Sequence, residues 1–159
     1  MNLVVDKIIQ VLKDTLPDKK IKNYFFGDIG EVAASMVPAV MVMPVTSVYE
    51  AKYTGYDLVR HTVTIVVVDD AKKYFSKSPQ EASGVKELVK LVEGVDDNGA
   101  LLTSSIAYVL RNKIKLDGAV TEGLKDLSSR YGFRPRGEFL GLEAEITGTA
   151  LTRVAVSRE

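Results

Sequence analysis

The run TVTIVVV at residues 62–68 constrains what this chain can fold into more than any other stretch. Every residue in it is β-branched, a type that suits a pleated strand. Because strand side chains alternate, Val63, Ile65 and Val67 share one face, while the opposite face mixes threonine with valine. The run therefore predicts a strand with one face in the core and the other face partly covered.

The residues before this run extend it into a sheet. Gly55 can supply the positive φ of a tight turn, which places a second strand ahead of it. Pro38 and Pro44 flank the apolar residues 40–43, and since proline cannot donate to a ladder, they indicate a strand end or an edge. We expect two or three antiparallel strands between Pro38 and Asp70.

Amphipathic helices are predicted before and after these strands in the sequence. Residues 3–16 carry apolar side chains at helical spacing, and Pro17 follows them. A short helical turn is expected at 31–36, after the extended aromatic residues 21–26. Ser78 is the expected N-cap of a helix that ends near Gly94, and a further helix is expected around 102–110.

The C-terminal third returns to strand alternation. Residues 71–78 and 132–137 are expected as loops, and 117–131 fits either a helix or strands. Residues 140–156 alternate apolar and polar, with Gly148 marking a bulge or a close approach. The prediction is a single domain over residues 1–159, of α+β class, with a mostly antiparallel sheet and helices packed on one face.

Composition narrows the function classes. Lysine plus arginine and aspartate plus glutamate both number 21, so the formal net charge is zero, which argues against general nucleic-acid or membrane-surface binding. The absence of cysteine excludes disulfides, thiolate metal sites and a cysteine nucleophile. No signal peptide is expected in the first residues, because Asp6 and Lys7 stand where its apolar core would run. The longest apolar run is shorter than a membrane span. No cofactor-binding motif is recognised.

Two groups of residues are candidates for catalysis. His61, the single histidine, could be a general base, but it lacks an evident partner and is expected as a surface residue at a strand end. Asp69 and Asp70 could hold a divalent metal for a nucleic-acid enzyme if further acids converged on them. Asp57, Asp96 and Asp97 are further candidates only because acidic residues are abundant in the chain. The plainer interpretation is a solvated strand end.

Arginines and aromatic residues gather near residue 133. Arg130, Arg134 and Arg136 stand close to Tyr131 and Phe133. Such a cluster can bind phosphates, and it can equally be a mobile arm that docks on another protein.

The order of the expected elements carries a resemblance. It comprises the N-terminal helix, Tyr24-Phe25-Phe26-Gly27, the proline-bracketed residues 37–44, the long hairpin ending at 62–68, the helix with Val85, Leu88 and Val92, and the closing strand with 143–146. In this order the chain resembles the tail terminator (tail completion) proteins of tailed bacteriophages and related neck proteins at the head–tail joint.

The resemblance implies a structural protein and not an enzyme. Members form a ring, usually of six subunits, that caps the tail tube and meets the neck connector at the tail–neck junction of the virion. The ring is assembled in the host cytoplasm, and DNA passes through its lumen. A small cytosolic adaptor domain is a third possibility, beside the ring protein and the metal-dependent enzyme.

Interface residues are expected on the loops. The expected contacts are Tyr53, Tyr56, Asp57, Lys72, Lys73, Arg134 and Arg136. Deletion of residues 134–136 is expected to spare folding and to harm assembly.

Overall fold

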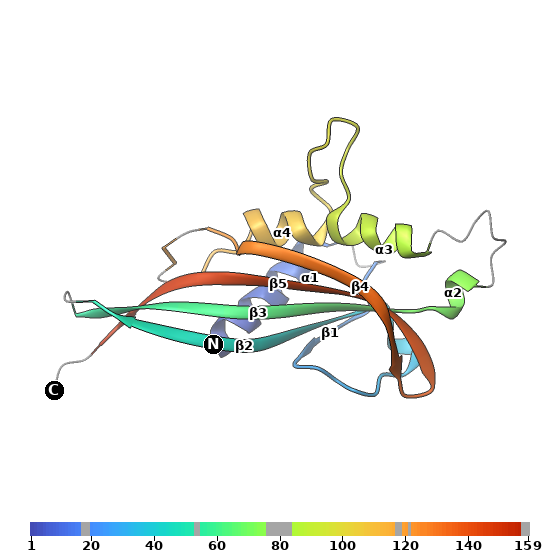
Figure 1. Ribbon diagram of the computed structural model, residues 1–159, viewed down its shortest axis with the longest axis horizontal. Helices are drawn as coiled ribbons and strands as arrows, with labels where there is room; N and C mark the ends of the chain where they lie inside the picture. The colour runs from blue at the N-terminus through green and yellow to red at the C-terminus, as the bar shows by residue number, and fades with distance from the viewer. Residues whose placement is uncertain (17–19, 53–54, 76–83, 117–118, 121, 157–159) are drawn as a thin grey trace.

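The computed structural model describes residues 1–16, 20–52, 55–75, 84–116, 119–120 and 122–156. A five-stranded sheet carries α1, α3 and α4 on one face, which confirms the predicted α+β class (Figure 1). The elements in order are α1 (Asn2–Thr15), β1 (Asn23–Phe26), the 3₁₀ turn η1 (Ala34–Met36), β2 (Ala39–Ala51), β3 (Tyr56–Asp70), α2 (Lys72–Phe75), α3 (Gly84–Glu93), α4 (Ile106–Asn112), β4 (Lys125–Arg136) and β5 (Phe139–Ala155).

The sheet has the strand order β1-β2-β3-β5-β4. All 15 residues of β3 pair with β5 in an antiparallel register. The short β1 runs parallel to β2 and pairs only with residues 39–42, so residues 43–51 of β2 form a free edge. The fold is therefore two antiparallel hairpins, β2–β3 and β4–β5, joined along the seam between β3 and β5.

The main core lies between the helices and one face of the sheet. Val63, Ile65 and Val67 are fully buried on this face, as their alternation predicts. Val5, Ile8 and Leu12 of α1 pack against them, because the apolar stripe of that helix faces the sheet. Other buried members come from α3, α4 and β5, namely Leu88, Val92, Ile106, Val109, Leu110, Leu142, Ala144 and Ile146.

A second, smaller core covers one end of the opposite face. Val66 and Val68 of β3 lie here with Met41 of β2. Val32 and Val37, from the connection between β1 and β2, close over them. This cluster explains why the mixed face of the long strand is buried at one end and more polar at the other.

The structure corrects several expected boundaries. Residues 132–137, expected as a loop, fall mostly within β4, and the ambiguous 117–131 becomes strand from Lys125 onward. Residues 72–75, also expected as loop, form α2. Pro44 lies inside β2, beside a register shift on the free edge, where its missing N–H costs no ladder hydrogen bond. The Ser78 N-cap lies outside the described residues.

Gly148 marks a close approach, as its place in the strand predicts. A Cβ atom there would lie 2.6 Å from Cδ2 of Leu127 and 3.2 Å from Cβ of Leu124. The glycine thus lets the segment leading into β4 lie directly on β5. In the described part of the chain, the helices are too short or too polar to cross a bilayer.

Candidate functional site

One end of the sheet extends past the helices. In Figure 1, the C-terminal end of β2, the start of β3 and the C-terminal end of β5 reach beyond α3 and α4 on the left. The 17 residues of β5 span about 55 Å at ~3.3 Å per residue, which is longer than the helix layer can cover. Val45, Val48 and Tyr49 of β2 and Val154 of β5 are exposed on this end, which we call the sheet arm.

An open groove of ≈ 750 Å³ lies where α1 meets the sheet arm. Its apolar lining includes Leu3 and Val4 from α1, Tyr49 from β2 and Val154 from β5. Leu3 is 84% exposed and Tyr49 is 63% exposed, which is unusual for side chains of this size and type. The groove is therefore an apolar surface that the described part of the chain leaves uncovered.

The rim of the groove is basic. The lysines Lys7 and Lys115 line it, against the single acid Asp6. Arg153 pairs with Leu58, so its side chain lies on the face of the sheet opposite α1, where its guanidinium carbon is 5.3 Å from the ring centroid of Tyr56. Lys115 makes a long ion pair of 3.7 Å with Glu122, at the exposed surface. No ion pair among the described residues includes Lys7, which is half-buried at the rim.

His61 lies in the wall of the groove and is only 4% exposed, so its expected place at the surface is wrong. Its Nδ1 lies 3.0 Å from the Ser47 hydroxyl, and its Nε2 lies 3.0 Å from the Thr152 hydroxyl. Burial lowers the pKa of the ring, with a smaller effect from the positive amino terminus. The three side chains tie β2, β3 and β5 together across the base of the sheet arm.

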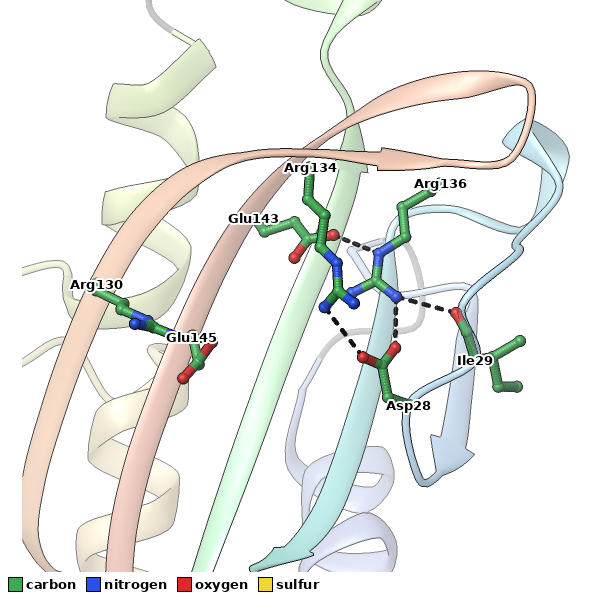
Figure 2. A network of polar contacts seen from close by, with 7 residues as sticks. All are labelled: Asp28, Ile29, Arg130, Arg134, Arg136, Glu143 and Glu145. Carbon is green, nitrogen blue, oxygen red and sulfur yellow. Dashed lines mark hydrogen bonds and ion pairs between the residues drawn. The ribbon is translucent and has the colours of Figure 1, made fainter.

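Arg136 and its carboxylate partners form a network at the other end of the sheet (Figure 2). Arg136 is fully buried, and its Nη1 donates to Asp28 and, at 3.0 Å, to the Ile29 carbonyl. Its Nε donates to Glu143, and Arg134 donates to Asp28 at 3.1 Å. The network fastens the connection after β1 to the β4–β5 hairpin.

The predicted arginine and aromatic cluster is split by the alternation of β4. Arg130 points to the same face as the Arg136 network and pairs with Glu145 at 2.8 Å. Tyr131 packs against the helix-side core, and burial together with Glu93 raises the pKa of its hydroxyl to about 12. Each arginine faces a carboxylate, so the cluster is a balanced set of ion pairs and neither a basic patch nor a loose arm.

The expected interface residues are distributed over the molecule. Tyr53 lies outside the described residues, while Tyr56 and Asp57 are half-buried at the start of β3. Lys72 and Lys73 are exposed at the opposite end of β3, where Nζ of Lys73 donates to Asp69 at 2.7 Å. Arg134 reaches solvent, whereas the buried Arg136 has no surface to offer a partner.

The acids considered for a metal site do not converge. Asp69 is 7% exposed and forms an ion pair with Lys73. A carboxylate oxygen of Asp70 accepts a hydrogen bond from the backbone N–H of Lys72 at 2.9 Å. Across the described ranges, no three histidine or acidic side chains gather closely enough to hold a metal ion.

A second exposed feature is the turn between α3 and α4, which we call the finger (residues 95–101). It rises clear of the helix layer at the top of Figure 1. One Asp96 carboxylate oxygen accepts from the backbone of Asn98 and Ala100, both at 2.9 Å, and Val95 bridges to Leu101. Gly99 adopts a positive φ of 78°, a backbone conformation that glycine allows in a tight turn. The finger is thus a folded projection that carries Asp97 and Val95 into solvent.

The sequence analysis predicted neither the groove nor the projection of the finger. One signal was available for Leu3, because it is a large apolar residue off the buried stripe of Val4, Val5, Ile8 and Leu12. Another was available for His61, which shares the alternation of the buried Val59 and Val63. Neither a scan against protein-family models nor a search of curated proteins gave a match for this chain.

Proposed function

We propose that this chain is a structural virion protein of a tailed bacteriophage. It forms a ring, usually of six subunits, that caps the tail tube and joins it to the head or neck connector. Its place is the tail–neck junction, after assembly in the host cytoplasm. The order of elements supports this proposal, since the helix, aromatic strand, long hairpin, helices and closing strand of the resemblance are all described elements.

The observation that carries the proposal is the uncovered sheet arm with its groove. Val45, Val48, Tyr49 and Val154 are each more than two-fifths exposed, and Leu3 adds to the same region. A monomer in water gains nothing from such a surface, and exposed apolar patches commonly mark binding sites for other proteins. A protein that assembles with other subunits can bury this apolar surface in its interfaces.

The charge balance is compatible with a DNA passage. Formal net charge is zero, and the arginines of β4 are matched by Asp28, Glu143 and Glu145. Affinity for DNA depends strongly on unpaired lysine and arginine charges near phosphates. A ring of such subunits would let DNA pass without holding it tightly.

The test is the native mass of the purified protein, with negative-stain images of the same sample. A closed ring, formed alone or on added tail-tube protein, is the expected result. A strict monomer under both conditions, up to high micromolar concentration, would overturn the proposal and favour the adaptor domain. A metal-dependent enzyme would instead reveal itself by divalent-metal binding that Asp69→Asn abolishes.

A further inference from the structure

The groove and the finger are complementary in charge and in apolar character. The groove offers Leu3, Tyr49 and Val154 within a rim that includes Lys7 and Lys115. The finger offers the exposed side chains of Asp97 and Val95, and Asp96 adds a second negative charge beside them. Charge complementarity of this kind guides association and fixes the register of an interface.

The finger is held in shape before any contact is made. The backbone N–H of Asp96 donates to the Ala100 carbonyl at 2.8 Å, and that of Gly99 donates to the Asp96 carbonyl at 3.0 Å. The N–H of Leu102 donates to the Gly94 carbonyl at 2.8 Å, which closes the base. A preorganised projection loses little conformational entropy on docking, which favours binding.

The two surfaces belong to different parts of one molecule. The groove is lined by α1, by the sheet arm and by residues 115–116, and no finger residue is among its lining. The finger rises from the junction of α3 and α4 instead (Figure 1). Contact between them therefore joins two copies head to tail, which is the heterologous geometry that closes into a ring or continues as a filament.

We propose that the finger of one copy docks in the groove of the next copy of this chain. The carboxylate of Asp97 then meets Lys7 and Lys115, while Val95 covers the apolar lining. The inference deepens the proposed ring function and rests on it, because it names the contact between neighbouring subunits. It makes the groove a self-assembly site and not a site for the tail tube.

Charge reversal tests the contact. Asp97→Lys and Lys7→Glu are each expected to weaken self-association by at least about tenfold, because like charges then face each other. A mixture of the two variants should assemble better than either variant alone. Asp14→Lys is the matched control, because Asp14 is an exposed acid of α1 outside the groove, and it should assemble like the unchanged chain.

Cysteine cross-linking gives a second measurement that does not depend on charge. The chain has no cysteine, so Asp97→Cys in one tagged copy and Leu3→Cys in another introduce one thiol each. Added copper phenanthroline oxidises two close thiols to a disulfide, and a mixed-tag dimer is the expected product. The pair Asp97→Cys with Asp14→Cys should give no more than random cross-linking.

The outcomes separate this inference from the proposed function. Rings that form equally well from Asp97→Lys, with no mixed-tag dimer, would overturn the inference and leave the ring function standing. Lys7→Glu rings that form but fail to bind tail-tube protein would also overturn it, since the groove would then take the tube. A protein that never self-associates, alone or on the tube, would overturn both.

Discussion

Arg136 and Asp28 stand 108 residues apart in the chain, yet the buried guanidinium of the first donates to the carboxylate of the second. Asp28 belongs to the connection after β1, and Arg136 ends β4 on the far edge of the sheet. The pair therefore clamps the first and last parts of the fold across the smaller core.

Arg136→Ala is expected to destabilise the fold by about 3 kcal/mol, because it leaves the carboxylates of Asp28 and Glu143 without their buried partner. Arg134→Ala is the matched control, since the Arg134 side chain is 56% exposed and its loss should cost under about 1 kcal/mol. Urea unfolding of both variants measures the difference. Equal losses would show that Arg136 is not the clamp.

Deletion of residues 134–136 should now unfold the protein and not merely block assembly. It removes the end of β4 together with the buried guanidinium. Loss of the cooperative unfolding transition in the deletion variant is the expected result, whereas a well-folded deletion variant would restore the original expectation of a dispensable loop.

Acid should loosen the same clamp. Burial by itself would raise the pKa of Asp28, but the hydrogen bond and charge of Arg136, helped by Arg134, hold that pKa below its ordinary value of 3.8. Because the folded pKa is the lower one, the stabilisation is present above pH 3.8 and is lost as pH falls through the folded value. The unfolding free energy of the unchanged chain should therefore fall more steeply on acidification than that of Asp28→Asn. Parallel curves would contradict this assignment.

His61 should make stability depend on pH in a higher range. Burial first, and then the amino terminus, lower its pKa below the ordinary 6.5, so the unfolded chain takes up the proton more readily. The stabilisation is complete above pH 6.5 and is lost as pH falls toward the folded pKa. His61→Gln keeps a donor and an acceptor but does not titrate, so its stability should be flatter in this range. The measurement is chemical unfolding at several pH values, and an unchanged slope would count against the assignment.

Gly123→Ala should be among the most harmful single-methyl changes. Gly123 has a φ of 70°, and a Cβ atom there would lie 1.8 Å from the Arg111 carbonyl oxygen. The expected loss is about 3 kcal/mol in the unfolding free energy. Gly27→Ala is the matched control, because Gly27 also has positive φ but open space around it, and only about 1 kcal/mol should be lost. Thermal unfolding of the two variants separates the clash from the backbone strain.

Much of the fold could be predicted from local pattern. The stripe of Val5, Ile8 and Leu12 predicts α1, and the alternation of Val63, Ile65 and Val67 predicts both β3 and its buried face. These signals succeed because burial selects apolar residues at the period of the element. They supply the fold class but not the pairing of strands.

The edge strand β4, which carries three arginines, could not be predicted from local pattern in the same way. Pro135 and the glycines at 132 and 137 favour a loop in isolation, yet β4 is an edge strand, where proline and charged residues are tolerated. The burial of Arg136 depends on Asp28, which lies far away in sequence. The groove depends on how far the sheet extends past the helices, which residue spacing does not encode.

The seam between β3 and β5 raises a problem of alignment for the folding chain. A slip of one residue would turn Val63 and Ile65 away from the main core, so the correct offset must be distinguished from the offsets one residue away. Two pairs of side chains distinguish it, since Thr64 bonds Thr147 at 3.3 Å and His61 bonds Thr152 at 3.0 Å only in the native register. These polar pairs therefore favour one alignment of the two hairpins over the many similar alignments that their alternating strands would otherwise allow.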